Sequence, residues 1–595
     1  MAPADDGSPA TSGSAPSLTI VNRSQTNGKI GKGEGAGNER REGSNPQIVV
    51  GFDGLNHRQQ RLARGGNQFS LEPPDQGLCA GNGLVLETVN DVMAVYDHTG
   101  ANLLGHPVDL NSFYGYAPAI NRTTGVRGPF VTDPSCYFDG ATQRWFHVVL
   151  TLETKPSGAF LGPNHLDIAV SQTSSPLGSW TIYRLPVQDD GSQLTPDHSC
   201  SLKRDGTGHG PCLGDYPHIG ADVNGFYITT NEYSFFGPEF KAAQIYALSK
   251  RELAANAASV LVTQIDTTKA VGGSQAGFTV WPAEVPNGHF DTARDGIEFF
   301  MSSNAADEVN PLQNRTSSDL IVWALRNTQS LDSAAPDVSL SSTVLTVGRY
   351  SAPPLSNQKA GDIPLAQCVN NTTLPVAPGL TGCWRLFFTA EPAHNEVESV
   401  IDSNDTRMQQ VMFADGMLFG ALDTALIVNG KAQAGIEWFA ARPHLTANGV
   451  IAQVVNQGYV GAADTNLTYP ALAVAESGVG VIAFSLLGTD DFPSAAYAPF
   501  NVKTGVGSIH VSAVGLGPDD GFTSYKAFVG NPPRTRWGDY GAAVVDGSNI
   551  WIASEYIGQT CTFAQWLSGS LGSCTGTRTS LGNWDTRITE LSIGS

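Results

Sequence analysis

A hairpin pattern that occurs twice, far apart in the sequence, constrains the fold of this chain more than any other feature. The copies span residues 214–233 and 538–556, and both open with Gly-Asp-Tyr and close with Glu-Tyr. Each carries an aspartate eight positions after its first glycine (222 − 214 = 8; 546 − 538 = 8), followed by a polar turn and an apolar run. Two apolar runs around a polar turn predict a β-hairpin, and its recurrence indicates a repeat architecture.

Five further hairpins of this kind bring the number of predicted units to seven. The seven units begin near Pro74, Asp133, Gly214, Val280, Met408, Tyr469 and Gly538. The 66 glycines and 35 prolines indicate many turns, and helical periodicity is scarce. We therefore predict a single all-β domain, a seven-bladed β-propeller, over residues 47–595. The long interval before the fifth hairpin predicts an insertion at about 330–405. The seventh unit lacks an outer strand, which residues 48–52 would supply.

The first 46 residues differ in composition from the rest of the chain. They are rich in glycine, serine, asparagine and charge. A segment with so little apolar content cannot bury enough surface to offset its ordering entropy, so we predict a disordered N-terminal leader.

Charge and motifs narrow the function. The formal net charge is −21, which argues against a nucleic-acid partner because such proteins need a basic face. No apolar run is long enough to span a membrane. Phosphate loops, dinucleotide fingerprints and the Gly-x-Ser-x-Gly elbow are also missing from the sequence. We expect a monomer without an organic cofactor.

The eight cysteines predict a disulfide framework. Three pairs are close in sequence and two cysteines remain, which gives Cys200–Cys212, Cys368–Cys383, Cys561–Cys574 and Cys79–Cys136. This pairing rests on proximity, and eight cysteines allow other connectivities. Four disulfides predict an oxidising compartment, hence a secreted protein. The sequence shows no signal peptide, so we expect one to have been removed.

Several motifs taken together resemble a broad family of uncharacterised secreted bacterial β-propeller proteins. They are Glu72-Pro-Pro-Asp75, Arg144-Trp-Phe146, Gly214-Asp-Tyr-Pro217 and Arg536-Trp-Gly-Asp-Tyr540. The resemblance covers most of residues 47–595 and implies a propeller without an assigned activity. Single blades are also similar to those of sialidase-like and polysaccharide-lyase propellers. The chain lacks the Ser-x-Asp-x-Gly-x-Thr-Trp repeat and a clear arginine triad, so no catalytic residue is carried over.

Chemistry is expected where the inner strands begin, because the second strand of each hairpin ends at the same face of the ring. Asp215 would begin an inner strand and Glu232 would end the next, and Asp539 and Glu555 repeat this arrangement. Asp75 and Asp133 hold the corresponding starting positions of the first two blades. The remaining polar and aromatic candidates beside them are Tyr216, His218, Trp281, Arg536, Trp537 and Tyr540.

Three interpretations of these carboxylates stay open. They can accept backbone N–H bonds in turns, they can bind Ca²⁺, with Asp75 and Asp133 as ligands, or they can act as acid and base on a glycan. In the last case Asp215, Glu232, Asp539 and Glu555 would supply acid and base, and Arg536 would hold an anionic group. The substrate-binding residues would be Tyr216, His218, Trp281, Trp537 and Tyr540.

The loop before Asp215 contains a further, weaker metal-site candidate, formed by His198 and His209 with a nearby aspartate. Overall the sequence predicts a secreted propeller that acts on or binds an extracellular carbohydrate or glycoconjugate through an acidic, aromatic funnel. As an enzyme it would be a glycoside hydrolase or a polysaccharide lyase. The alternative is a non-catalytic, Ca²⁺-stabilised binding or surface-interaction protein.

Overall fold

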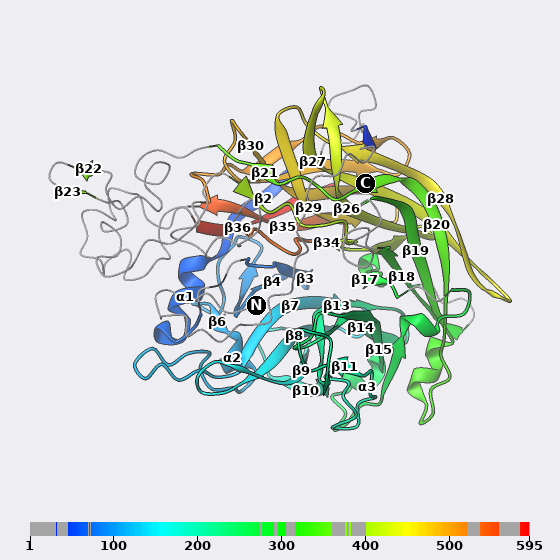
Figure 1. Cartoon of the computed structure of the whole chain (residues 1–595). Coiled ribbons are helices and arrows are strands. Elements are labelled where there is room, and N and C mark those ends of the chain that lie inside the picture. The colour runs from blue at the N-terminus through cyan, green and yellow to red at the C-terminus, as the bar shows by residue number, and fades with distance from the viewer. Residues whose placement is uncertain are drawn as a thin grey trace.

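Seven antiparallel sheets, arranged as blades around one axis, form a β-propeller (Figure 1). The computed structural model describes residues 31–32, 46–69, 71, 73–273, 276–290, 295–304, 316–359, 375–377, 380–381, 400–519, 536–558 and 583–593. The prediction of an all-β, seven-bladed propeller is therefore confirmed. The predicted leader lies outside the described residues except for 31–32 and 46.

The first four blades follow one another along the chain. Blade one contains β3 (Gly77–Gly81), β4 (Leu84–Val89), β5 (Val92–Asp97) and β6 (Val108–Asp109). Blade two contains β7 (Phe130–Asp139), β8 (Arg144–Thr154), β9 (Phe160–Ser171) and β10 (Trp180–Pro186). Blade three contains β13 (Cys212–Ala221), β14 (Gly225–Ser234), β15 (Phe240–Ser249) and β16 (Val262–Asp266). Blade four contains β17 (Phe278–Pro282), β18 (Ile297–Ser303), β19 (Thr316–Arg326) and β20 (Ser339–Ser351).

The remaining blades complete the ring. Blade five contains β25 (Met412–Ala414), β26 (Met417–Val428), β27 (Lys431–Thr446) and β28 (Gly449–Val460), and β1 (Gly31–Lys32) pairs with β26. Blade six contains β29 (Thr465–Val474), β30 (Val479–Gly488), β31 (Ser494–Asn501), β32 (Gly505–Val506) and β33 (His510–Ala513). Blade seven contains β34 (Ala542–Asp546), β35 (Asn549–Gly558), β36 (Asn583–Ser592) and β2 (Gln47–Asn56).

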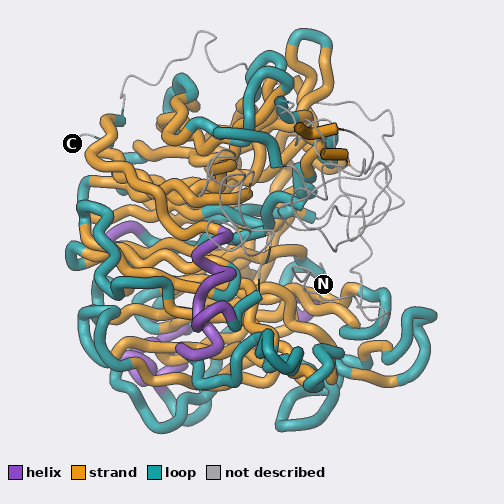
Figure 2. The backbone as a smooth tube through the Cα atoms, turned by 90° about the vertical axis from the view of Figure 1, so that its left-hand side faces the viewer, coloured by secondary structure: helices purple, strands orange, loops and turns teal. Residues whose placement is uncertain are grey.

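Short elements decorate the connections. The α-helices are α1 (His57–Gly66), α2 (Leu110–Phe113) and α3 (Lys250–Ala254), and the 3₁₀ turns are η1 (Thr267–Lys269), η2 (Pro286–Gly288) and η4 (Thr328–Asp332). Two-residue to three-residue strands form the pairs β11 (Cys200–Ser201) with β12 (His209–Gly210), β21 (Ser356–Asn357) with β24 (Val400–Ile401), and β22 (Pro375–Ala377) with β23 (Leu380–Thr381). Figure 2 shows α1 on the outside of a body built mainly of strands.

The ring closes by joining the two ends of the propeller. Strand β2 pairs antiparallel with β36, with Ile48 opposite Leu591 and Phe52 opposite Ile588. The prediction that residues 48–52 supply the missing outer strand is confirmed. This pairing places both ends of the propeller in one blade, so the ring cannot open without separating β2 from β36.

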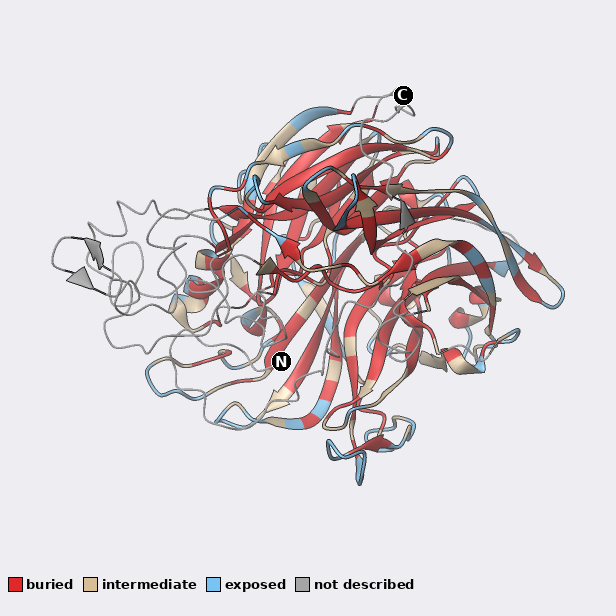
Figure 3. Cartoon of the chain, turned by 45° about the horizontal axis from the view of Figure 1, so that its top comes forward, coloured by how far each residue is buried: buried red, intermediate tan, exposed pale blue. Residues whose placement is uncertain are grey.

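Apolar side chains on both faces of the blades form the core, because each sheet packs between two others. Phe146 of blade two stacks on Phe226 of blade three with ring centroids 4.5 Å apart. Trp145 and Trp323 are fully buried, as is Trp551. Figure 3 shows the buried residues concentrated along the strands and the exposed ones at the loops. Burial on both faces explains why the strands read as continuous apolar runs.

The aspartate eight positions after Gly214 has a structural role. Asp222 accepts hydrogen bonds from the backbone N–H groups of Asn224 at 2.9 Å and Gly225 at 2.5 Å. It also accepts one from the Tyr227 hydroxyl at 3.0 Å. These bonds fix the turn of the hairpin, as aspartate does in Asx turns.

Two predicted disulfides are present. Cys79–Cys136 links β3 of blade one to β7 of blade two, and Cys200–Cys212 closes the loop before blade three, with Cα atoms 5.7 and 5.3 Å apart. The predicted pairs Cys368–Cys383 and Cys561–Cys574 lie outside the described residues. None of the described helices is long and apolar enough to cross a membrane.

The proposed insertion at about 330–405 begins within the propeller itself. Its first part contains β20, the fourth strand of blade four. Residues 360–399, except for β22 and β23, lie outside the described residues. The extent of an insertion between blades four and five stays a prediction.

Candidate functional site

Carboxylates from four blades meet two guanidinium groups at one end of the propeller axis. We call this group the axial cluster, and its members are Asp75, Asp133, Asp215, Arg407, Arg536 and Asp539. Asp75 and Asp539 lie just before the inner strands β3 and β34, whereas Asp133 and Asp215 are the fourth residues of the inner strands β7 and β13. Electrostatic interactions link Asp133 to Asp75, Asp215 and Arg536, so residues from distant parts of the chain share one environment.

Local backbone geometry helps to direct these side chains. Asp75 and Asp133 have φ angles of 51° and 53°, in the left-handed region that aspartate tolerates better than most residues. The register of β7 shifts between Thr132 and Ser135, and that of β13 between Asp215 and His218. Bulges of this kind re-aim side chains, and here they lie where the inner strands approach the axis.

Asp539 is the most connected member of the axial cluster. Its carboxylate pairs with Arg536 and lies 3.4 Å from Nη1 of Arg407. Its backbone N–H donates to Oδ1 of Asp75 at 2.7 Å, and its carbonyl oxygen accepts from the Asn404 side chain at 3.1 Å. Two guanidinium groups therefore stabilise negative charge on Asp539 in a fixed geometry.

Arg407 is held in place from two sides. Asp405 accepts hydrogen bonds from Nε at 2.8 Å and from Nη2 at 2.6 Å. Nη1 donates to the Tyr216 hydroxyl at 3.1 Å, and the guanidinium lies over the Tyr216 ring, 5.4 Å from its centroid. Arg407 and Asp405 were not among the residues predicted from the sequence. The available signal was an Asp-x-Arg pair directly before the fifth predicted hairpin.

The axial carboxyl groups have unusual proton affinities. Burial, opposed mainly by Arg536, raises the pKa of Asp75 to about 6. Burial, reinforced by Asp215 and Asp75, raises the pKa of Asp133 well above its ordinary value. Burial also raises the pKa of Asp215, against the opposing effects of both arginines. Buried carboxylates outnumber the arginines here, so this site can hold protons near neutral pH.

The five aromatic and histidine candidates lie in the packed core beneath this cluster rather than on an open rim. Tyr216 and Tyr540 stack in parallel, 5.9 Å apart, and His218 stacks on Trp281 at 3.9 Å. Trp537 has no exposed surface and donates to the Ser485 hydroxyl at 3.0 Å. These contacts make the aromatics a rigid support, and their role as ligand contacts stays a prediction.

The structure separates Asp215 from Glu232, which the sequence analysis expected to act together. Glu232 pairs with Gly214 in the β13–β14 ladder, whereas Asp215 pairs with Asn231. Because side chains alternate along a strand, Asp215 and Glu232 point to opposite faces of blade three. Asp215 therefore belongs to the axial cluster, and Glu232 faces the interface with blade two.

Glu232 instead forms a group with Asp189 and His198, which we call the blade-three cluster. Nδ1 of His198 lies 2.8 and 2.9 Å from the two Glu232 oxygens and 3.5 Å from Oδ2 of Asp189. The hydrogen bond to Glu232 raises the pKa of His198. Burial and then Glu232 raise the pKa of Asp189 to about 8.

Ligand atoms of the blade-three cluster all lie within 4.8 Å of one another, which is metal-binding geometry. Among the described residues, the blade-three cluster is the group with this spacing of ligand atoms. Asp75 and Asp133, which were predicted as metal ligands, are not part of the blade-three cluster. His198 was a candidate metal ligand from the sequence, whereas Asp189, nine residues before it, was not. His209, its other histidine, instead pairs with Asp197 at 2.9 Å on the surface.

Glu555 lies beside Gly538, the residue before Asp539. It is 4% exposed and lines a cavity of about 10 Å³ with Tyr469, Gly538 and Tyr540. A space of this size holds about one water molecule, so it is not a substrate pocket.

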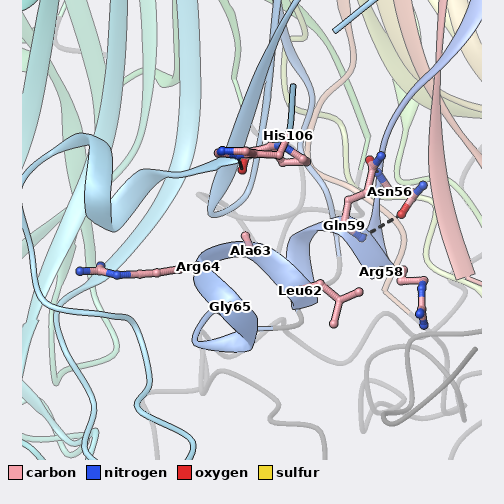
Figure 4. Close-up of a pocket in the computed structure, with 9 residues that line it drawn as sticks. Asn56, Arg58, Gln59, Leu62, Ala63, Arg64, Gly65 and His106 are labelled. Atoms are coloured by element: carbon pink, nitrogen blue, oxygen red, sulfur yellow. Dashed lines mark hydrogen bonds between the residues drawn. The ribbon is translucent and has the colours of Figure 1, made fainter. Parts of the chain in front are cut away.

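A larger pocket lies beside helix α1, away from both clusters. It has a volume of about 660 Å³ and is lined by Asn56, Arg58, Gln59, Leu62, Ala63, Arg64, Gly65, His106 and Pro107. Figure 4 shows the α1 side chains below His106, with Gln59 hydrogen-bonded to Asn56. That bond belongs to the capping box of α1, so it serves the helix start.

The fold and the axial cluster define the protein as a seven-bladed β-propeller with an acidic group of side chains on its axis. The chain matches no protein-family model, and no curated protein is similar to it in sequence. Among solved structures it resembles an apocarotenoid oxygenase from Synechocystis, with 8% identity, a TM-score of 0.32 and coverage of 72% of this chain and 68% of that one.

Two further solved structures belong to other functional classes. An exo-β-1,3-galactanase from Clostridium thermocellum shares 10% identity with a TM-score of 0.28, covering 92% of this chain and 100% of that one. A subtype N10 neuraminidase-like protein of an A/little yellow-shouldered bat/Guatemala isolate shares 9% identity with a TM-score of 0.30. The match covers 76% of this chain and 98% of that one. Similarities this low indicate neither a family nor an activity.

Proposed function

We propose that this protein is a secreted β-propeller that binds an extracellular carbohydrate or glycoconjugate at the axial cluster. The observation that carries the proposal is the convergence of Asp133, Asp215 and Asp539 with Arg407 and Arg536 at one end of the axis. Carboxylates accept hydrogen bonds and guanidinium groups donate them. Neighbouring sugar hydroxyl groups both donate and accept, so such a ligand satisfies both kinds of side chain.

The exposure of the cluster suits a ligand that approaches along the axis. The side chains of Arg407, Arg536 and Asp539 are 14%, 10% and 13% exposed, so the group is neither sealed nor fully solvated. Both arginines already have carboxylate partners in this cluster, and the protein carries a net charge of −21. A polyanion such as nucleic acid would meet repulsion here, whereas a ligand rich in hydroxyl groups would not.

Secretion is part of the same proposal. Cys79–Cys136 and Cys200–Cys212 join parts of the chain that lie in neighbouring strands or at the ends of one loop. Disulfides of this structural kind persist in oxidising compartments and are rare in reducing ones. An extracellular location would place the axial cluster among glycans.

Hydrolysis of the bound glycan is a second candidate function, favoured by a contrast within the cluster. Burial and like charges favour the protonated form of Asp133, whereas two guanidinium groups stabilise negative charge on Asp539. A proton donor and an ionised carboxylate are the pair that glycoside hydrolysis requires. In this version Asp133 is the acid and Asp539 or Asp215 the base. Glu232 belongs to the blade-three cluster and Glu555 lies beside Gly538, and the catalytic roles predicted for both stay predictions.

A panel of neutral and acidic polysaccharides tests both versions. Binding is measured by isothermal titration calorimetry, and turnover by released reducing ends and by the absorbance of unsaturated uronates, which report hydrolysis and lyase cleavage respectively. We expect at least one polysaccharide to bind wild-type protein and to bind Asp539→Asn at least tenfold more weakly. The exposed Asp197→Asn variant serves as the matched control and should bind normally.

Two outcomes would overturn the proposal. One is that no polysaccharide in the panel binds, and the other is that Asp539→Asn binds as tightly as wild type while folding normally by circular dichroism. A calcium chelator such as EGTA tests the predicted Ca²⁺ requirement separately. A melting temperature that falls in EGTA and recovers with added Ca²⁺ would support the Ca²⁺-stabilised binding module.

A further inference from the structure

We propose that the blade-three cluster, Asp189, His198 and Glu232, binds a divalent transition metal of the Zn²⁺ class. This inference is independent of the carbohydrate proposal, because the axial cluster shares no side chain with it. The three residues come from two elements: Glu232 from β14, and Asp189 and His198 from the loop between β10 and β13.

The spacing of the donor atoms fits a small metal ion. Zinc binds histidine nitrogen at about 2.0–2.1 Å and carboxylate oxygen at about 2.0–2.2 Å, which places tetrahedral ligand atoms roughly 3.3 Å apart. In this structure Nδ1 of His198 lies 2.8 Å from Oε1 of Glu232 and 3.5 Å from Oδ2 of Asp189. Small side-chain movements would therefore place all three donors around one ion.

The cluster places two buried carboxyl groups beside a single imidazole. The side chains of Asp189 and Glu232 are 0% and 2% exposed, and the ion pairs that each forms within the described part of the chain are with His198. Oδ1 of Asp189 is buried without a hydrogen-bond partner. Two buried carboxylates beside one imidazole are costly to hold in low dielectric, and a divalent cation would neutralise them.

A second layer of polar groups orients the carboxylates. Nε2 of Gln264 donates to Oδ2 of Asp189 at 2.6 Å, and Nε2 of Gln244 lies 3.5 Å from Oε2 of Glu232. Metal-binding carboxylates are commonly held by such outer hydrogen bonds, which fix the ligand geometry. The His198 side chain is 21% exposed, so the ion has a route from solvent and room for a water ligand.

Backbone hydrogen bonds and a disulfide hold the loop that carries Asp189 and His198. His198 donates its backbone N–H to the Asp189 carbonyl oxygen at 2.9 Å, and Cys212 donates to the Gln188 carbonyl oxygen at 2.6 Å. The Cys200–Cys212 disulfide closes the same segment. Because the loop is already ordered, binding would cost little additional conformational entropy.

The donor set selects the class of metal. One imidazole nitrogen with carboxylate oxygens suits Zn²⁺ and neighbouring transition metals. Calcium takes six to eight oxygen ligands and rarely nitrogen, so the blade-three cluster is a poor site for it. The Ca²⁺ predicted from the sequence, with Asp75 and Asp133 as ligands, is therefore a different site.

Zinc titration of the full chain, with its disulfides intact and after dialysis against a chelator, tests the proposal. We expect one equivalent of Zn²⁺ to bind by calorimetry, with Ca²⁺ binding at least tenfold more weakly at this site. His198→Gln and Asp189→Asn should each weaken Zn²⁺ binding at least tenfold. His209→Gln is the matched control, because His209 forms an exposed pair with Asp197 in the same loop.

Cobalt substitution gives a readout that a purely structural ion pair would not change. Bound Co²⁺ should show visible d–d absorption bands in wild-type protein and in His209→Gln, and these bands should disappear in His198→Gln. Absence of stoichiometric Zn²⁺ binding, equal binding by His198→Gln and wild type, or a loss of equal size in His209→Gln would overturn the proposal. Circular dichroism shows whether His198→Gln is folded. If it is not, Zn²⁺ binding by Asp189→Asn tests the proposal instead.

Discussion

The backbone N–H of Asp539 donates to the Asp75 carboxylate at 2.7 Å, across the seam between the last and the first blade. The second oxygen of Asp75 accepts from the Asn90 side chain at 2.8 Å. Asp75 is 1% exposed, so these two donors depend on it rather than on water. The residue that the sequence analysis placed at the start of blade one therefore also closes the ring at its axis.

Replacing Asp75 should weaken this closure. Asp75→Ala leaves two buried donors unsatisfied, at about 1–3 kcal/mol each, so we expect the unfolding free energy to fall by about 2–6 kcal/mol. In Asp75→Asn the side-chain oxygen can still accept from the Asp539 N–H, but the new NH₂ group faces the NH₂ group of Asn90, and neither can accept. We therefore expect about half of that loss. Urea denaturation measures both changes.

Exposed Asp464 provides the control for this experiment. Its φ angle of 57° matches the 51° of Asp75, but it lies on the surface. Asp464→Ala therefore reports the cost of alanine in the left-handed conformation together with the small contribution of an exposed ion pair to Lys431. Equal losses in Asp75→Ala and Asp464→Ala would show that the seam hydrogen bonds contribute nothing.

Glu87 should give stability a pH dependence near neutrality. Its buried carboxyl accepts hydrogen bonds from the Leu55 N–H at 2.8 Å, from the Tyr96 hydroxyl at 3.1 Å and from Thr586. Burial nevertheless raises its pKa to about 7, from an ordinary 4.5. The stability associated with the protonated form is complete below pH 4.5 and is lost as pH rises through 7, by about 3 kcal/mol.

The Glu87→Gln variant tests this dependence because glutamine is neutral at every pH. Its amide can accept from Leu55 and donate to the Thr586 hydroxyl. The unfolding free energy of Glu87→Gln minus that of wild type should be about 3 kcal/mol larger at pH 8 than at pH 4. Urea denaturation at both values measures this, and parallel pH profiles for the two proteins would contradict the assignment.

The two described disulfides should differ in their contribution to stability. They enclose sequence separations of 12 and 57 residues. In the chain-entropy model these loops contribute about 3 and about 4 kcal/mol respectively. We expect Cys79→Ser/Cys136→Ser to lower the unfolding free energy more than Cys200→Ser/Cys212→Ser. Denaturation of both variants in parallel checks the order, and a reversed order would show that native contacts, not loop closure, dominate.

Local patterns in the sequence were sufficient to predict the blades and the strand that closes them. The turn of a hairpin and its two apolar strands lie within about twenty residues, so a short sequence pattern is enough to predict them. Asp222 is an example, since its position eight residues after Gly214 follows from the turn that it caps. The same patterns also assigned Asp75, Asp133, Asp215 and Asp539 to inner strands or to the residues just before them, although Asp133 and Asp215 lie four residues into β7 and β13.

Side-chain direction was harder to predict than position. Glu232 reaches the expected end of β14, but the pairing of Glu232 with Gly214 sends its side chain away from Asp215. A one-residue change of register reverses every side chain of a strand, and hairpin sequences do not specify it to that accuracy. Asp189 and Arg407 lie in loops between strands, where the sequence has no periodic pattern that predicts side-chain positions. Each cluster also depends on contacts between distant residues: His198 binds Glu232, 34 positions away, and Arg407 binds Tyr216, 191 positions away.

A buried ion pair between blades two and three provides the last prediction. Nζ of Lys250 lies 3.1 Å from Oδ1 of Asp139, with the two side chains 2% and 0% exposed. The same ammonium group donates to the Asp222 carbonyl oxygen and lies 3.8 Å from the centroid of the Phe290 ring. Asp139 also holds the turn after β7, by accepting from the Thr142 N–H at 2.9 Å.

Removing one partner of this pair should cost more than removing both. Lys250→Met leaves a buried carboxylate uncompensated, so we expect a loss of about 3–5 kcal/mol of unfolding free energy. In Lys250→Met/Asp139→Asn no charge remains to be compensated, and the amide oxygen can still accept from Thr142, so the double variant should recover about half of that loss. Urea denaturation of the two single variants and the double variant measures the coupling. Additive losses would mean that Lys250 acts through its alkyl packing and not through its charge.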